Sequence, residues 1–368
     1  MQIKRASTHE HYERLYGTIE LLAAGTSNAA KTCNVDLKVI VVLPGRSTSQ
    51  HVHLRTESIL FVEAGPIVLE SSLAGQKTVL EAGDIVVVDV AEDHRLVNEG
   101  LATARVFEIQ SPGYKKTDTV PLSSALRRVE LPTGRFWSPG NQVKLKVCGV
   151  RTLEVAYACH ELGVDAIGLH ALGPKWSTVL SCEDWIPAVP EQLSVFLLTD
   201  ARRPEILASL VHRLRCTAIQ LQGQTSDQQL AEVASAAKEL GVKLVKTLPV
   251  PADQDLTSAL RYVHTTESTV DAFLLDKGWY GGTGATTNWQ NARKLVSSTT
   301  TPIILAGGLN EANAVEACIT VKPYAIDVES SLEWRLPLNG RLIKPKSVLK
   351  IQRLLSSLHV LQEDARSD

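Results

Sequence analysis

Two different hydrophobic rhythms divide the chain. Between residues 36 and 110, short apolar or alternating runs such as SILFVEAG and DIVVVDV are separated by Gly, Pro, Ser and charged turns. Several strands at such close spacing are typical of a β-barrel or a β-sandwich. From residue 143 onward, apolar runs alternate with amphipathic helical segments such as DQQLAEVASAAKELG. The pattern predicts an all-β domain followed by an α/β domain.

The second rhythm contains eight strand candidates. A parallel sheet that is buried on both faces requires continuous apolar strands of this kind. Eight strand and helix units within about 220 residues match a TIM (β/α)8 barrel, and a doubly wound open sheet is the alternative. The candidates are residues 143–149, 164–170, 193–200, 217–223, 242–250, 270–276, 301–308 and 324–329.

The stretch between the two rhythms carries Pro and Gly and shows little sustained periodicity. We therefore expect a multidomain chain with a β-barrel over residues 1–115 and an α/β TIM barrel over residues 142–368. Residues 116–141 would form the linker, with a short helix at the segment SSALRR.

Composition excludes several classes of protein. Apolar residues make up 44% and charged residues 21% of the chain, as in an ordinary globular protein. The 38 basic and 40 acidic residues are dispersed and form no stripe of the kind that binds nucleic acid. No apolar run is long enough to span a membrane, the N-terminus lacks a signal-peptide core, and the six cysteines have no paired spacing. We expect a cytoplasmic protein that binds neither nucleic acid nor membranes, and a homodimer is left open.

The first domain carries a candidate metal site. The segment GRSTSQHVHLRTE places His51 and His53 two residues apart and Glu57 four residues further on. Residues two apart on a strand project from the same face, so both imidazoles can reach one ion. His94 follows a later apolar run. Imidazole and carboxylate ligands with open coordination positions suit Fe, Mn, Ni, Zn or Co, and ligand type alone does not choose among these divalent metals.

This part of the chain, residues 36–110, resembles the cupin family in its two motifs. The first is a glycine followed by His-x-His and Glu, and the second is a glycine followed by a later His and Asn. The second motif departs at two turn positions, where Asp89 and Ala91 replace the family's frequent Pro and Gly. The resemblance implies a small barrel that binds a metal, although many cupin-like barrels are structural or sense a ligand. The motif residues are Gly45, His51, His53, Glu57, Gly83, His94 and Asn98.

The second domain has candidate catalytic residues at the ends of its predicted strands. Cys148 ends the first strand and Asp276 ends the sixth, and glycine-rich loops follow the sixth and seventh strands. Backbone N–H groups of such loops approach an anion closely, and we expect a helix beginning near Asn310 to add its positive end. The loops therefore predict a cradle for a phosphate or a carboxylate.

Residues 143–357 resemble the phosphoribosylanthranilate isomerase family, in which K-(I/V)-C-G, L-L-D, G-G-T-G, L-A-G-G-L-N and D-V-S-S-G-V-E occur in this order. The resemblance implies an Amadori rearrangement with Cys148 as general base and Asp276 as general acid, and it implies no cofactor for the barrel. A desolvated aspartate can hold a proton near neutrality. A cysteine base needs thiolate character, which Lys146 assists if its side chain turns toward the site. Otherwise Cys148 is a small buried hydrophobic residue.

The chain departs from this family at positions that bind the substrate. Thr178 replaces an arginine tied to the acidic aglycone, and Lys175 is then the nearest cation. A carboxylate such as Glu329, placed near a phosphate, repels it unless it is protonated, bridged by a cation or turned into the barrel wall. We therefore expect a different substrate, whose phosphate is absent or shifted. The candidate substrate-binding residues are Lys146, Lys175, Gln222, Gly281, Gly282, Thr283, Gly284, Gly307, Gly308, Asn310, Glu329, Ser330 and Ser331.

Three functions remain open. The leading hypothesis is an Amadori-type isomerase, acting on a glycosylamine or a related sugar or aminosugar in specialised metabolism, with the metal-binding cupin acting in the same pathway as a second activity. A second hypothesis places the chemistry in the cupin, as a metal-dependent oxygenase, isomerase or epimerase, with the TIM barrel holding the substrate. A third is a ligand-binding protein without catalysis.

Overall fold

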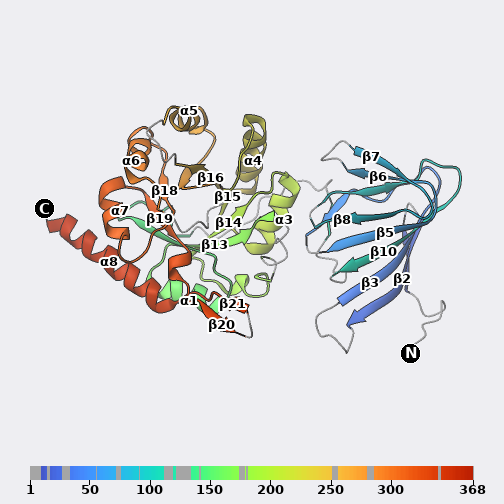
Figure 1. Cartoon of the computed structure of the whole chain (residues 1–368), viewed down its shortest axis with the longest axis horizontal. Coiled ribbons are helices and arrows are strands. Elements are labelled where there is room, and N and C mark those ends of the chain that lie inside the picture. Colours follow the sequence, from blue (N-terminus) through green and yellow to red (C-terminus); the bar gives the residue numbers. More distant parts are fainter. Residues whose placement is uncertain are drawn as a thin grey trace. The chain divides into compact units, whose positions relative to one another are not determined.

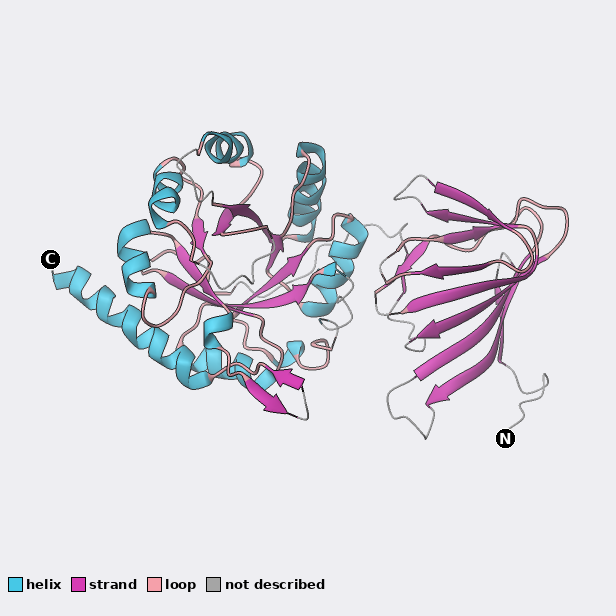
Figure 2. Cartoon of the chain, viewed as in Figure 1, coloured by secondary structure: helices cyan, strands magenta, loops and turns pink. Residues whose placement is uncertain are grey.

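A computed structural model describes most of the chain, which divides into two compact units. Met1–Ala125 and Pro174–Ser177 form the first unit, and Leu126–Gly173 and Thr178–Asp368 form the second. The first unit is built of strands, and the second alternates strands with helices (Figure 2). The described residues are 10–14, 17–26, 34–54, 56–71, 76–90, 92–111, 119–121, 134–140, 142–173, 179, 181–250, 256–279, 286–338 and 341–367.

The described strands of the first unit form three antiparallel sheets, ordered β1-β2-β3-β10-β5-β8, β7-β6-β9 and β11-β4 (Figure 1). The two larger sheets share one core, because alternate residues of β3, β5 and β10 pack against β6, β7 and β9. The expected all-β domain is confirmed. The strands are β1 (Glu10–Arg14), β2 (Gly17–Thr26), β3 (Asn34–Val42), β4 (His51–His53), β5 (Glu57–Ala64), β6 (Ile67–Ser71), β7 (Gln76–Leu80), β8 (Ile85–Val88), β9 (Arg95–Val97), β10 (Ala104–Ser111) and β11 (Thr119–Pro121).

Three of these strands lie outside the run that the hydrophobic pattern predicted. β1 and β2 precede residue 36, and β11 falls within the expected linker, residues 116–141. Val120 of β11 pairs with Val52 of β4, and both side chains are buried. A three-residue strand is too short for its periodicity to be recognised, so only tertiary pairing identifies it. The expected helix at SSALRR lies outside the described residues.

The second unit is a closed eight-stranded parallel barrel in the order of the sequence (Figure 1). All eight predicted strands are confirmed, and β12 pairs with both β13 and β19, which excludes an open doubly wound sheet. The barrel strands are β12 (Lys144–Cys148), β13 (Ala166–Ala171), β14 (Ser194–Thr199), β15 (Ala218–Leu221), β16 (Lys243–Pro249), β17 (Ala272–Asp276), β18 (Ile303–Leu305) and β19 (Ala325–Val328).

Helices surround the barrel, and local sequence sets their ends. In α4, Ser226 and Gln229 form a reciprocal capping box, and Gly241 ends the helix in the left-handed region. None of the helices in the described parts of the chain is long and apolar enough to cross a membrane. The remaining elements are α1 (Leu153–Leu162), η4 (Ile186–Ala188), α3 (Pro204–Leu214), α4 (Asp227–Leu240), α5 (Thr257–Thr266), α6 (Trp289–Ser297), α7 (Ala314–Val321), η5 (Ser330–Leu332), β20 (Leu336–Leu338), β21 (Arg341–Ile343) and α8 (Val348–Ser367).

Residues 134–140 close the N-terminal end of the barrel. The backbone N–H of Arg135 donates to the carbonyl of Gln192, which precedes β14, and the Tyr324 hydroxyl donates to the carbonyl of Phe136. The Phe136 ring is fully buried and meets Phe196 edge to face. This part of the expected linker therefore belongs to the barrel core.

Candidate active site and metal centre

Three histidines of the first unit converge on one point. In β4, Val52 points into the core, while the Nε2 atoms of His51 and His53 lie 3.2 Å apart, as their two-residue spacing predicts. The backbones of His51 and His94 pair through two N–H to carbonyl hydrogen bonds, which bring the third ring alongside. One ring nitrogen from each histidine lies within 4.8 Å of the other two.

The environment of these rings suits metal ligation. Burial lowers the pKa of His51 to about 4 and that of His53 to about 2, so both are neutral near pH 7. Neutral imidazole is the form that binds metals. The Nδ1 atoms of His51 and His94 lie 2.7 Å and 3.2 Å from the carbonyls of Ser49 and Glu92. A carbonyl at Nδ1 holds the proton there and leaves the Nε2 lone pair for an ion, so the three side chains fit a divalent transition metal.

The structure does not bring the expected fourth ligand, Glu57, to the histidines. Glu57 begins β5 with an exposed side chain, whereas its neighbour Ser58 points inward and is buried. Side chains alternate along a strand, so an inward Ser58 turns Glu57 outward. The buried amide of Gln110 lies at His53 instead, 3.3 Å from Nε2, and it also bonds to the carboxylate of Glu108.

The mouth of the barrel holds a second cluster. Cys148 ends β12 and pairs with Gly168 of β13, so His170, two residues further along β13, faces the same interior. The His170 Nε2 atom lies 3.2 Å from the Cys148 sulfur and 3.6 Å from Glu329 Oε1. A Cβ atom at Gly168 would lie 2.6 Å from that sulfur, so only glycine leaves room for it.

A buried ion pair lies beside Cys148. The Lys146 side chain is fully buried, and its Nζ donates to Asp327 Oδ2 at 2.8 Å. Although burial opposes its charge, Asp327 and Cys148 keep the pKa of Lys146 above its ordinary value. Burial raises the pKa of the Cys148 thiol well above its usual range, while Lys146 acts in the opposite direction. Burial lowers the pKa of His170. The cluster thus favours a neutral thiol beside a neutral imidazole.

Asp276 lies at the end of β17, on the same rim. Burial raises its pKa to about 6, although the Lys277 backbone N–H donates to its Oδ1 at 2.6 Å. A carboxyl group with such a pKa retains a proton close to neutrality and suits a general acid.

A cavity of about 210 Å³ joins Asp276 to the glycine loop that follows β18. Gly307 and Gly308 both adopt positive φ angles, and a Cβ atom at Gly307 would lie 2.9 Å from Asp276 Oδ1. Asp327 and Glu329 line the same cavity. Two cationic side chains, Arg151 and Lys344, also line it.

Several predicted substrate-binding residues lie at this mouth. Glu329 faces His170 and the cavity, so it does not turn into the barrel wall. Ser330 lines the cavity, and the Ser331 hydroxyl donates to the carbonyl of Leu309 at 2.7 Å. Lys175, Thr178 and residues 281–284, which are Gly281, Gly282, Thr283 and Gly284, lie outside the described residues.

The helix expected to begin near Asn310 begins later, since α7 starts at Ala314. The Asn310 backbone N–H donates to Asn313 Oδ1, and its own Oδ1 accepts from the Ala312 backbone N–H. These bonds build a turn in front of the helix. The helix therefore starts four residues after Asn310, because an asparagine can satisfy a backbone N–H two residues further on in a turn as well as at a helix cap.

The barrel interior contains polar atoms without partners among the described residues. Gln222 is 4% exposed, and its Oε1 atom has no hydrogen-bond partner. The same holds for Gln220 Oε1, Thr247 Oγ1 and Asp327 Oδ1. Buried polar atoms are normally paired with protein, water or a ligand, so these four atoms have unused hydrogen-bonding capacity, and Asp327 is the one of the four residues that lines the cavity.

His170 is a site residue that the sequence did not reveal. His170 lies two residues beyond Gly168, the residue that pairs with Cys148. That position points to the site only once the pairing of β12 with β13 is known. Arg151 and Lys344 were missed for the same reason, since they come from a loop and a hairpin that meet at the cavity.

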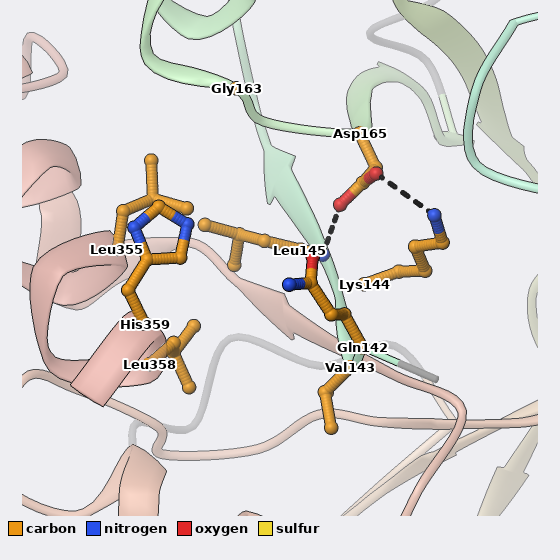
Figure 3. Close-up of a pocket in the computed structure, with 9 residues that line it drawn as sticks. All are labelled: Gln142, Val143, Lys144, Leu145, Gly163, Asp165, Leu355, Leu358 and His359. Atoms are coloured by element: carbon orange, nitrogen blue, oxygen red, sulfur yellow. Dashed lines mark hydrogen bonds and ion pairs between the residues drawn. The ribbon is translucent and has the colours of Figure 1, made fainter. Parts of the chain in front are cut away.

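A smaller hollow lies at the N-terminal end of β12 (Figure 3). Asp165 accepts there from the Leu145 backbone N–H at 2.9 Å and lies 3.5 Å from Lys144 Nζ. Its volume is about 60 Å³, against about 210 Å³ at the mouth. Catalysis in such barrels takes place at the carboxyl ends of the strands, so this hollow is a structural feature.

Comparisons with known proteins agree with the two units. Residues 145–335 match the family model of N-(5'phosphoribosyl)anthranilate (PRA) isomerase, and residues 38–110 match the cupin domain model. The N-(5'-phosphoribosyl)anthranilate isomerase of Methanocella arvoryzae is 32% identical over 195 residues, which cover 52% of this chain and 89% of the relative. That of a Synechococcus species is 32% identical over 224 residues, covering 58% and 89%. The solved N-(5'-phosphoribosyl)anthranilate isomerase of Pyrococcus furiosus is 23% identical, with a TM-score of 0.48, and the match covers 60% of this chain and all of that one.

Proposed function

The chain belongs to the N-(5'-phosphoribosyl)anthranilate isomerase family, and on this premise we propose that it catalyses an Amadori-type rearrangement of a glycosylamine other than phosphoribosylanthranilate. The observation that supports this most strongly is the pairing of a proton-retaining Asp276 with the Cys148 and His170 couple at one barrel mouth. Asp276 holds the proton that the acid of this reaction must give, and His170 can accept the proton that Cys148 must lose to act as the base.

The rearrangement needs one acid and one base. Asp276 gives its proton to the ring oxygen of the glycosylamine, and the ring opens to an iminium ion. The sulfur of Cys148 removes the proton from C2, which leaves an enaminol. The enaminol becomes the aminoketose when C1 gains a proton and the C2 hydroxyl loses one, so the reaction is an isomerisation without an external oxidant.

Cys148 needs a partner to act as a base, because burial keeps its thiol protonated. His170 Nε2, at 3.2 Å, can accept that proton. The resulting imidazolium is stabilised by Glu329, whose Oε1 lies 3.6 Å from the same nitrogen. The Lys146 ammonium, also beside the sulfur, stabilises the thiolate.

The cavity favours a substrate that differs from the family's own. The Glu329 carboxylate shares the cavity with the Gly307 and Gly308 loop, where it repels a phosphate dianion. Arg151 and Lys344 offer a place for an anionic group that lies further out. The unpaired oxygens of the barrel interior fit the hydroxyl groups of a sugar. We therefore favour a glycosylamine that lacks a phosphate or holds it in another position.

The first unit would act in the same pathway as a second activity. His51, His53 and His94 would hold a divalent transition metal, which supplies Lewis acidity when bound. Their convergence also supports the competing hypothesis, in which the cupin carries the main chemistry and the TIM barrel holds the substrate.

An assay of phosphoribosylanthranilate beside its dephosphorylated analogue tests the proposal. We expect turnover to the aminoketose with preference for the dephosphorylated compound. Cys148→Ala and Asp276→Asn should each lower kcat by about 10²- to 10⁴-fold, the usual contribution of a general acid or base. Cys318→Ala, which removes another buried thiol, is the matched control and should retain activity.

Two results would count against the proposal. Preference for the phosphorylated compound would refute the role given to Glu329. Full activity in either catalytic variant, with an unchanged circular dichroism spectrum, would refute the assignment of acid and base.

A further inference from the structure

The Cys148, His170 and Glu329 side chains, which the proposed isomerase uses for proton transfer, also have the geometry of a metal site. One ligand atom from each, a sulfur, a ring nitrogen and a carboxylate oxygen, lies within 4.8 Å of the other two. We propose that these three residues form a second metal site, in the barrel mouth, for a thiophilic divalent cation such as Zn²⁺. Among the described residues, only His51, His53 and His94 form a comparable group.

The decisive feature is that two groups approach the same ring nitrogen. A cysteine, histidine and carboxylate relay uses both nitrogens of the imidazole, one for the thiol and the other for the carboxylate. Here the sulfur and the carboxylate oxygen lie 3.2 Å and 3.6 Å from His170 Nε2. Ligands bound to one tetrahedral Zn²⁺ at about 2.0–2.3 Å are themselves about 3.4–3.5 Å apart. The two separations from His170 Nε2 fit an ion that replaces the shared proton.

The barrel holds these donors before any ion arrives. Cys148 and His170 lie on the adjacent strands β12 and β13, and Glu329 directly follows β19, which pairs with the other edge of β12. Two glycines leave the space that the donors need. A Cβ atom at Gly168 would lie 2.6 Å from the sulfur, and one at Gly149 would lie 2.9 Å from Glu329 Oε1.

The local charges also suit a divalent cation. Lys146 and Asp327 form an ion pair, 2.8 Å apart, that adds no net charge, although Lys146 also lies beside the sulfur. A thiolate at Cys148 and the carboxylate of Glu329 then supply two negative charges, which match those of the metal. A bound cation stabilises the thiolate that burial otherwise disfavours.

Metal binding at this site should inhibit the isomerase, an effect that rests on the proposed function. A metal bound to the Cys148 sulfur uses the electron pair with which the residue would remove the substrate's C2 proton. The ion should therefore inhibit the isomerase reversibly, and a chelator should restore activity.

Titration of the metal-free full-length protein with Co²⁺ tests the site. Thiolate ligation of Co²⁺ produces a sulfur-to-metal charge-transfer band in the near ultraviolet, which a site of histidines and carboxylates does not produce. We expect this band in the wild-type protein and in His94→Ala, and its loss in Cys148→Ser. His170→Ala should weaken Co²⁺ binding at least about tenfold, since loss of even an outer partner of a metal ligand costs about 10- to 100-fold.

The metal site and the isomerase activity can be refuted independently of each other. Absence of the band in the wild-type protein, or its persistence in Cys148→Ser, overturns the metal site and leaves the isomerase proposal intact. Asp276→Asn should retain the band while losing isomerase activity. A wild-type protein that shows the band but converts no glycosylamine would retain the metal site and refute the isomerase.

Discussion

Burial favours the neutral form of three titratable residues of the barrel mouth, Asp276, Cys148 and His170. It raises the pKa of the Asp276 carboxyl and the Cys148 thiol, and it lowers the pKa of His170. The acid is therefore present in the form that the reaction needs. The base is not, and it must be generated by transfer of the thiol proton. Burial at the barrel mouth thus keeps Asp276 protonated for its role as the acid, and it makes Cys148 depend on its neighbours to lose its proton.

The pH profile of isomerisation should report Asp276. Because its pKa in the folded protein is raised to about 6, the carboxyl keeps its proton below that pH and loses it above. We expect kcat to fall about tenfold per pH unit on the alkaline side, since only the protonated form donates. The measurement is kcat against pH with the preferred glycosylamine.

Asp271→Asn is the matched control for that profile, because Asp271 lies at the opposite end of β17, where it accepts from the Leu244 backbone N–H. The control should show the same descending limb. A wild-type kcat that stays constant as the pH rises through this pKa would remove Asp276 from the role of general acid.

At the scale of elements, strand pairing decides where a polar residue points. The sequence places Glu57 four residues after His53, but the residues of β5 alternate, and Ser58 takes the inward position. Gln110 of β10 reaches the histidines because β10 pairs with β5 in the register Gln110 to Ser58. The local motif identifies three donors, and the sheet determines which further side chain joins them.

The segment before β12 provides a test of packing. Phe136 is fully buried against Phe196, Trp137 and Tyr324 at the base of the barrel. Phe136→Ala should lower the free energy of unfolding of the barrel by about 3–5 kcal/mol, as other Phe to Ala changes in cores do. Chemical denaturation of the full-length chain measures this loss.

An exposed apolar residue of the same unit serves as the control. Ile319 on α7 is 56% exposed, and Ile319→Ala should change stability by no more than about 0.5 kcal/mol. If Phe136→Ala were equally mild, residues 134–140 would behave as the linker that their composition indicates.

At the scale of the whole molecule, the two units hold different kinds of chemistry. The first presents three clustered histidines, and the second presents an acid, a thiol and a polar cavity. The barrel reaction as proposed needs no metal. The two activities should therefore be separable within the intact chain.

Chelation tests this separation. Treatment with a chelator should remove metal from the histidine site, and His94→Ala should lower the metal content in the same way. Isomerase activity should be retained or increased, because the barrel site is proposed to be inhibited by metal. The measurements are metal content by elemental analysis and turnover on the same samples. Loss of turnover in parallel with loss of metal would favour the cupin-centred alternative.

The sequence alone predicted the fold class of both units, and it supplied the candidate acid and base on which the proposal rests. Continuous apolar strands alternating with helices specify a parallel sheet covered on both faces, and eight such units favour a barrel, although only the pairing of β12 with β19 excludes an open sheet. Motif spacing brought His51 to His53, because residues two apart share one face of a strand whatever the rest of the fold.

Tertiary structure decided which side chains from distant parts of the chain lie together. The register of β12 against β13 and β19 brings His170 and Glu329 to Cys148, across 22 residues in one case and from the end of the last strand in the other. Sequence spacing does not predict such long-range contacts, because strand register is set by packing over the whole barrel. The same packing turned Glu57 away from the histidines and Glu329 toward the mouth.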